Sequence, residues 1–172
     1  MSLEGKKIAI LLEDGYEELE FWYPKLRMEE EGAKVTVLAP QRKVYRGKHC
    51  LEAKADRAVS EVNVDDFDAL IIPGGHAPDR LRRYEEILSF VKEMDEKGKV
   101  IAVICHAGHV LVSAKILKGR KVTGFFSIKD DLINAGAEYI DEPVVVDGNL
   151  ISSRHPGDLG HFCRAIIEKL KG

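Results

Sequence analysis

The stretch that decides the fold reads VIAVICHAGHVL and runs from Val100 to Leu111. Its first half is an unbroken apolar run, which is typical of a strand buried on both faces of a parallel sheet. The run ends at Cys105 and His106, and the small residues that follow favour the start of a helix. A strand, a sharp turn and a helix in this order predict an α/β fold with a nucleophile elbow at Cys105.

The same alternation of apolar strands and helical segments extends through the whole chain. Further buried strands are expected at residues 7–12, 34–39 and 68–73, a short strand at 121–124, and hairpins within 44–59 and 144–153. Helices are expected at residues 17–31, 84–97, 106–114, 129–135 and 157–170, with Pro24 kinking or interrupting the first of them. We therefore expect one domain over residues 1–172, with a mostly parallel sheet and helices on both of its faces.

The composition argues against several classes of function. The 172 residues carry a net charge of -3 without a basic stripe, so no nucleic-acid-binding surface is indicated. No apolar run reaches the roughly 18 residues of a membrane span, and the N-terminus lacks the apolar stretch of a signal peptide. We therefore expect a cytoplasmic protein without a membrane partner. The abundance of Glu and Lys is a pattern seen in proteins from hot environments.

The three cysteines, Cys50, Cys105 and Cys163, are interpreted as separate thiols. An odd count without a C-x-x-C pair argues against a disulfide framework and against a zinc ribbon. Cys50 lies in a weakly patterned hairpin, and Cys163 is expected to pack in the core from the last helix. Because the histidines show no metal-ligand spacing, we expect neither a metal nor a cofactor.

Cys105 is the strongest candidate for a reactive group. At the elbow the unpaired amides and the positive dipole end of the next helix face the sulfur, which favours the thiolate. Taken alone, this residue is equally well explained as a buried core cysteine. The polar residues around it favour the reactive interpretation, because parallel sheets place their active sites at the carboxyl ends of the strands.

Two pairs of residues are expected at the same edge of the sheet. Gly74 and Gly75 follow a buried strand and can turn backbone amides into a cleft, as an oxyanion hole requires, although a simple tight turn has the same pattern. Glu17 and Glu20 share one face of the first helix, where acidic side chains often only complement the helix dipole. A carboxyl beside the thiolate can instead hold a proton and donate a hydrogen bond to sulfur.

The chain resembles the PfpI family, the intracellular protease I group within the superfamily of Parkinson-associated deglycase. The resemblance covers nearly the whole chain and rests mainly on YEELE at residues 16–20, FDALIIPGGHAPD at 67–79, ICH at 104–106, IKDDLINAG at 128–136 and VVVDGN at 144–149. It implies a flavodoxin-like three-layer sandwich with an elbow of the class I amidotransferase type. It also implies self-association, as a homodimer or a hexamer.

The resemblance further implies the roles of individual residues. It makes Cys105 the nucleophile, His106 its partner, and Glu20 the acidic residue in contact with the cysteine, with Glu17 matching a second recurrent glutamate. Asp79 matches the acidic residue that protease-like members are thought to supply from a neighbouring subunit to complete a triad; the archetype has a glutamate there.

Two departures from the family pattern concern the pocket. Ala107-Gly108 stands where the archetype has Gly-Pro, so the pocket is expected to differ. Relatives outside the subgroup carry a histidine after the next strand, whereas residues 124–127 read GFFS in this chain. The absence of this histidine favours a reaction that depends on His106 as the partner of Cys105.

Carbonyl chemistry follows from these residues. Cys105 would attack a carbonyl while His106 moves the proton and amides near Gly75 and His106 hold the oxyanion. A peptide carbonyl gives peptidase activity, methylglyoxal gives a cofactor-independent glyoxalase, and a glycated amine or thiol gives a deglycase; we favour the small carbonyls. The alternative is a non-catalytic stress protein, a redox sensor or chaperone that uses oxidised Cys105.

Overall fold

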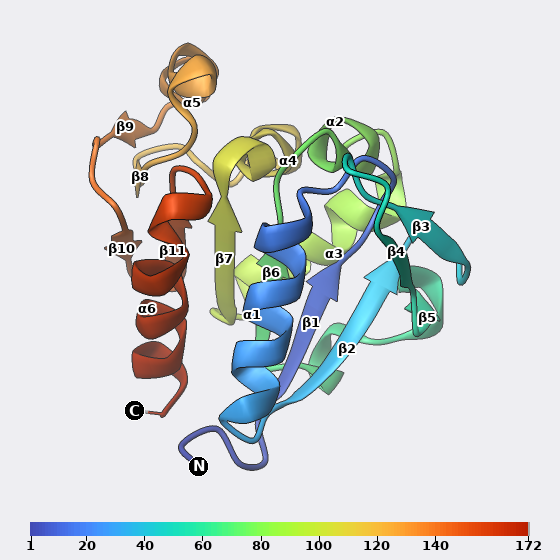
Figure 1. Cartoon of the computed structure of the whole chain (residues 1–172). Coiled ribbons are helices and arrows are strands. Elements are labelled where there is room, and N and C mark those ends of the chain that lie inside the picture. The colour runs from blue at the N-terminus through green and yellow to red at the C-terminus, as the bar shows by residue number, and fades with distance from the viewer. Residues whose placement is uncertain (172) are drawn as a thin grey trace.

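The central sheet is built from the apolar runs that the sequence predicts. A computed structural model describes residues 1–171. Its strands are β1 Lys7–Leu11, β2 Lys34–Ala39, β3 Val44–Arg46, β4 Glu52–Lys54, β5 Arg57–Ala58, β6 Ala69–Ile72, β7 Val100–Ile104, β8 Lys121–Val122, β9 Glu138–Tyr139, β10 Val145–Asp147 and β11 Leu150–Ser153. The main sheet has the order β10-β11-β7-β6-β1-β2-β5, and every neighbouring pair is parallel except β10 and β11 (Figure 1). The predicted parallel sheet is confirmed.

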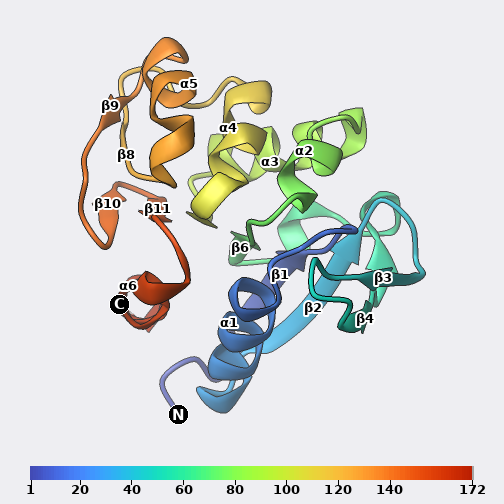
Figure 2. The same cartoon turned by 45° about the horizontal axis from the view of Figure 1, so that its top comes forward.

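Helices cover both faces of this sheet. They are α1 Glu18–Glu30, α2 Ala77–Leu81, α3 Glu85–Glu96, α4 Gly108–Ala114, α5 Lys129–Asn134 and α6 Leu159–Lys171. One apolar core joins the sheet to α1 and α6, through side chains such as Phe21 and Phe162. A second core joins the opposite face to α3 and α4, through Phe90 and Leu111 among others. Figure 2 shows α1 and α6 on one side and α2 to α5 on the other, which gives the predicted three-layer sandwich.

The strand register brings the polar turns together. Ile72, the last residue of β6, pairs with Val103 of β7. The segments after β6 and β7 therefore leave the sheet side by side, at its carboxyl edge. The arrows of β1, β2 and β7 point toward this same edge (Figure 1). Gly74 and Cys105, which lie 31 positions apart in the sequence, thus become neighbours.

Several local predictions are corrected. Helix α1 runs through Pro24 without interruption, and the proline is buried against the core, where packing offsets the missing backbone hydrogen bond. Helix α2, which carries Pro78 in its first turn, was not expected. The strand expected at 121–124 is only two residues long and pairs with β9 in a separate small sheet. Among the helices of residues 1–171, none has both the length and the apolar character needed to cross a membrane.

Candidate active site

Cys105 lies at the predicted elbow. It directly follows β7 and opens a short 3₁₀ turn, Cys105–Ala107, that leads into α4. Its φ angle is +63°, in the left-handed region that a non-glycine residue occupies only at a cost of about 1–3 kcal/mol. Strand pairing of β7 with β6 and β11 on both sides holds this conformation in place. The predicted sharp turn at the cysteine is therefore confirmed, and it carries backbone strain.

The thiol is less accessible and less acidic than the sequence predicts. Cys105 is only 8% exposed, because Gly74 and Glu20 pack beside it. Burial raises the pKa of the Cys105 thiol to about 12, and repulsion from an ionised Glu20 adds to the rise. The amides of His106 and Gly75 lower the pKa but do not outweigh burial. The expectation that the elbow favours the thiolate form of Cys105 is therefore wrong.

Glu20 reaches this thiol from the first turn of α1. The residue is 0% exposed, and its Oε1 accepts a hydrogen bond from the Gly74 amide at 2.9 Å. Burial raises the pKa of Glu20 to about 8, and the charge of Glu17 contributes to the rise. The carboxyl is therefore protonated at neutral pH, and its repulsion of a Cys105 thiolate is absent there. Oε2 of Glu20 has no hydrogen-bond partner within residues 1–171. A proton on this oxygen can therefore be donated to the sulfur of Cys105.

The two glycines after β6 serve different functions. The Gly74 amide donates to Glu20, so the prediction that it is an oxyanion donor is wrong. A Cβ atom at Gly74 would lie 2.5 Å from Oε1 of Glu20 and 2.7 Å from Cβ of Cys105, so only glycine fits there. Gly75 has a φ of +85° and turns its amide toward the Cys105 sulfur, as predicted. Whether Gly75 and His106 also hold a substrate oxyanion stays a prediction.

Glu17 has a structural role in the site. Its buried side chain caps α1 by accepting a hydrogen bond from the Glu20 amide at 3.1 Å. This bond satisfies one of the unpaired amides at the helix start and fixes the first turn that carries Glu20. The charge of Glu17 also keeps Glu20 protonated. A direct part for Glu17 in proton transfer stays a prediction.

His106 is in contact with the nucleophile. Its Nδ1 lies 3.3 Å from Sγ of Cys105. Burial lowers the pKa of His106, and electrostatic interactions with His109, His76 and Lys48 lower it further. The ring is therefore neutral at neutral pH, and its Nδ1 can accept the thiol proton. The predicted Cys105–His106 pair is brought together, as a thiol beside a neutral imidazole.

Two residues that were not predicted from the sequence hold the His106 ring. Phe125 stacks on it, with ring centroids 5.1 Å apart and an interplanar angle of 25°. Ser127 places its Oγ 3.2 Å from Nε2. Both belong to the GFFS segment at residues 124–127, for which the sequence indicated only the absence of a histidine. The only sequence signal for Phe125 and Ser127 is that their segment follows a short strand. Nothing in the local sequence pattern indicates that they contact His106.

Asp79 lies on α2, and within residues 1–171 its side chain is paired with Arg83 rather than with His106. Its exposed carboxylate accepts a hydrogen bond from Arg83 at 2.5 Å, and this bond lowers the pKa of Asp79. A contact with His106 of a neighbouring subunit would have to compete with Arg83. The triad shared between subunits, with Asp79 as its acid, therefore stays a prediction.

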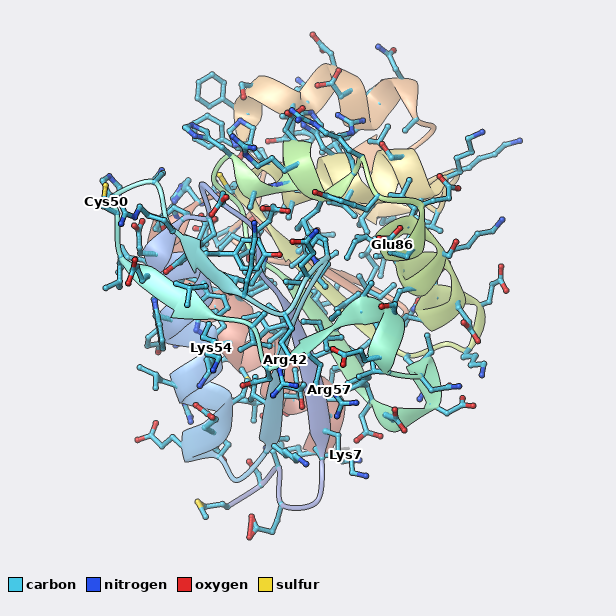
Figure 3. The ribbon with its side chains drawn as sticks, turned by 90° about the vertical axis from the view of Figure 1, so that its right-hand side faces the viewer. Lys7, Arg42, Cys50, Lys54, Arg57 and Glu86 are labelled. Carbon is cyan, nitrogen blue, oxygen red and sulfur yellow. The ribbon has the colours of Figure 1, made fainter. Side chains whose placement is uncertain are left out.

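The loop between β3 and β4 borders the site. Glu18 is largely buried, and its carboxylate accepts hydrogen bonds from the amides of His49 at 2.7 Å and Leu51 at 3.3 Å. Glu17, Glu18 and the His49 ring lie close enough to suggest metal ligands, but these bonds explain Glu18 as an anchor for the loop. Cys50 follows at the outer end of the loop, at the margin of the molecule (Figure 3).

Comparisons with known proteins identify the family of the chain. Residues 6–169 match the model of the DJ-1/PfpI family. The chain is 47% identical over 165 residues to "Deglycase PfpI" of Pyrococcus furiosus, covering 96% of this chain and 99% of the relative. It is 40% identical over 171 residues to "General stress protein 18" of Bacillus subtilis, covering 96% and 99%. The crystal structure of Drosophila melanogaster DJ-1beta superposes with a TM-score of 0.92 at 30% identity, over 97% of this chain and 91% of that one. The chain belongs to the DJ-1/PfpI family.

Proposed function

We propose that the protein is a cysteine-dependent enzyme that converts small reactive carbonyl compounds, with Cys105 as the nucleophile. The observation that carries this proposal is the contact of one strained, buried thiol with a neutral imidazole on one side and a protonated carboxyl on the other. The deglycase name of the 47% identical relative supports the same class of chemistry. Carbonyls of α-oxoaldehydes, free or attached to amines and thiols, are the proposed substrates.

The proposed reaction begins with general-base catalysis. Nδ1 of His106 takes the thiol proton while Sγ of Cys105 attacks the aldehyde carbon, which forms a hemithioacetal. Glu20 keeps its proton at neutral pH, so no negative charge opposes the developing thiolate. With methylglyoxal, transfer of hydrogen from the former aldehyde carbon to the ketone carbon and hydrolysis of the resulting thioester give lactate. The sum is methylglyoxal plus water to lactate, without an external oxidant.

Limited access supports small carbonyls over peptides. Only 8% of Cys105 is exposed, and the stacked Phe125 and His106 rings border the thiol. A small aldehyde can approach the sulfur without displacing the two rings. A peptide carbonyl carries polypeptide chain on both sides, which the rings would obstruct. Peptidase activity therefore requires more rearrangement at the site.

The decisive experiment compares substrates. Purified protein is mixed with methylglyoxal, and separately with casein or a fluorogenic peptide, with Cys105→Ala as the control. We expect lactate to form from methylglyoxal, no cleavage of casein, and no turnover by the variant. Cleavage of casein without conversion of methylglyoxal would contradict the proposal and favour a peptidase.

A non-catalytic redox function is the second candidate. The amides of Gly75 and His106 already face the sulfur, and the unpartnered Oε2 of Glu20 can donate to an oxidised sulfur. These donors suit a sulfinate that forms when peroxide oxidises Cys105. If neither substrate were converted and peroxide oxidised Cys105 readily, this second function would replace the first.

A further inference from the structure

We infer that Ser127 is a positioning residue for His106, and that it completes the catalytic pair within one chain. The inference rests on the proposed function, because it gives Ser127 a role only if His106 acts as the base for Cys105. The inference gives a role to Ser127 of the GFFS segment, residues 124–127, where relatives outside the subgroup carry a histidine.

The two ring nitrogens of His106 have different partners. Nδ1 lies 3.3 Å from Sγ of Cys105, and Nε2 lies 3.2 Å from Oγ of Ser127. Phe125 stacks against the ring face and limits its rotation. The imidazole is thus held between sulfur and hydroxyl, with one nitrogen assigned to each.

The hydroxyl has a defined position relative to the sulfur. Ser127 lies in a short 3₁₀ turn, Phe126–Ile128, which follows directly after Phe125. The Phe125 amide donates to the carbonyl oxygen of Cys105 at 3.1 Å, and the Ile128 amide closes the turn by donating to the Phe125 carbonyl at 3.0 Å. The segment is therefore fastened to the elbow itself, so Ser127 and Cys105 keep their places on either side of His106.

This arrangement accommodates the tautomer that takes up a proton at Nδ1, because the Ser127 hydroxyl can accept a hydrogen bond as well as donate one. A neutral ring has one N–H donor and one bare nitrogen, and the bond made by one nitrogen determines which form is present. The Ser127 hydroxyl can accept from Nε2–H, which leaves Nδ1 bare and able to take the thiol proton. When that proton arrives, Nε2–H continues to donate to the same oxygen, so Ser127 also stabilises the imidazolium.

Asp131 and Asp79, which interact with His109 beside His106, already have partners. Asp131 lies 3.0 Å from Nε2 of His109, and Asp79 is bound to Arg83. The other titratable groups around the ring are Cys105, which is coupled to Glu20, and His76, His109 and Lys48, whose electrostatic interactions lower the pKa of His106. Within residues 1–171, Ser127 is the hydrogen-bond partner of Nε2.

The test compares Ser127→Ala, Ser127→Thr and Ser127→Asp by kcat and KM for methylglyoxal from pH 5 to 10. Loss of one neutral hydrogen bond is expected to lower kcat about 3- to 10-fold in Ser127→Ala, with KM unchanged. Threonine keeps the hydroxyl and should retain most of kcat. Aspartate places a charge beside Nε2, so the acidic limb of the pH profile should move up by about one pH unit. Ser89→Ala removes an exposed hydroxyl from α3 and serves as the matched control.

Labelling of Cys105 by iodoacetamide separates this inference from the proposed function. If the wild-type protein converted no methylglyoxal, the proposed function would fail, but the labelling rates at pH 7 would still test Ser127. We expect labelling about 3- to 10-fold slower in Ser127→Ala and close to wild type in Ser127→Thr. Wild-type rates and pH profile in Ser127→Ala, together with a loss of kcat in Asp79→Ala, would overturn the inference in favour of a neighbouring subunit's acid. Equal losses in Ser127→Ala and Ser127→Thr would also overturn it, because the hydroxyl would then have no part.

Discussion

Cys105→Ser is expected to lower kcat/KM for methylglyoxal by at least about 1,000-fold, which corresponds to about 4 kcal/mol of transition-state stabilisation. The serine hydroxyl is similar in size but is a much weaker acid than a thiol, so the neutral His106 cannot deprotonate it readily. The backbone conformation at φ +63° and the contacts of Glu20 remain available in the variant. The measurement is steady-state lactate formation at pH 7.

Cys50→Ser is the matched control for this loss. Cys50 is also a cysteine with a positive φ angle, +69°, but it is exposed and lies at the outer end of the β3–β4 loop. Its replacement should leave kcat/KM within about twofold of wild type. A Cys105→Ser protein that kept a tenth or more of the activity would show that another group performs the attack.

Glu20→Gln is expected to change the pH dependence of stability by several kcal/mol. The pKa of Glu20 is raised from its ordinary value of 4.5 to about 8, mainly by burial. The native state therefore holds this proton more tightly than the unfolded chain, and its contribution to stability, fully present below pH 4.5, is lost as pH rises through 8. At about 1.4 kcal/mol per pKa unit, the loss amounts to about 5 kcal/mol. Glutamine has no such proton and escapes this loss.

Urea unfolding from pH 4.5 to 9 measures this effect. The free energy of unfolding of Glu20→Gln minus that of the wild type should increase steadily as pH rises and should level off above pH 8. Glu30→Gln, which alters a solvent-exposed carboxyl of the same helix, should follow the wild-type curve. Parallel curves for Glu20→Gln and wild type would mean that Glu20 is ionised in the native protein at neutral pH.

The fold was predictable where the sequence carries long regular patterns. The apolar runs of β1, β2, β6 and β7, and the periodic helices α3 and α6, were placed within a few residues. Two-residue strands such as β8 and β9 are too short for any alternation to be recognised. The short α2 follows directly after the glycine turn, and its five residues are too few for a helical period to be recognised.

The sequence predicted which residues form the centre of the site, but not all of their contacts or their pKa values. Cys105 was identified from the local motif at the carboxyl edge of the sheet, and the roles of His106 and Glu20 came from the resemblance to the family. The contact of Ser127 with His106 joins two separate segments, and no local pattern marks it. The pKa values of Cys105 and Glu20 depend chiefly on burial, which tertiary packing determines. For this reason the prediction of an acidic thiolate at the elbow was wrong, although its sharp turn was predicted correctly.

The most direct test is the alkylation of Cys105 by iodoacetamide from pH 6 to 10, with the exposed Cys50 of the same molecules as the internal reference. Peptide mass spectrometry gives the ratio of the two rates at each pH. In the wild type, the proton held by Glu20 is lost above pH 8, and the new charge then opposes the Cys105 thiolate. We therefore predict that the ratio of Cys105 to Cys50 alkylation falls through pH 8 in the wild type and does not fall in Glu20→Gln. A ratio that rises through pH 8 in the wild type, or that is the same in both proteins, would contradict the coupling of this thiol to Glu20.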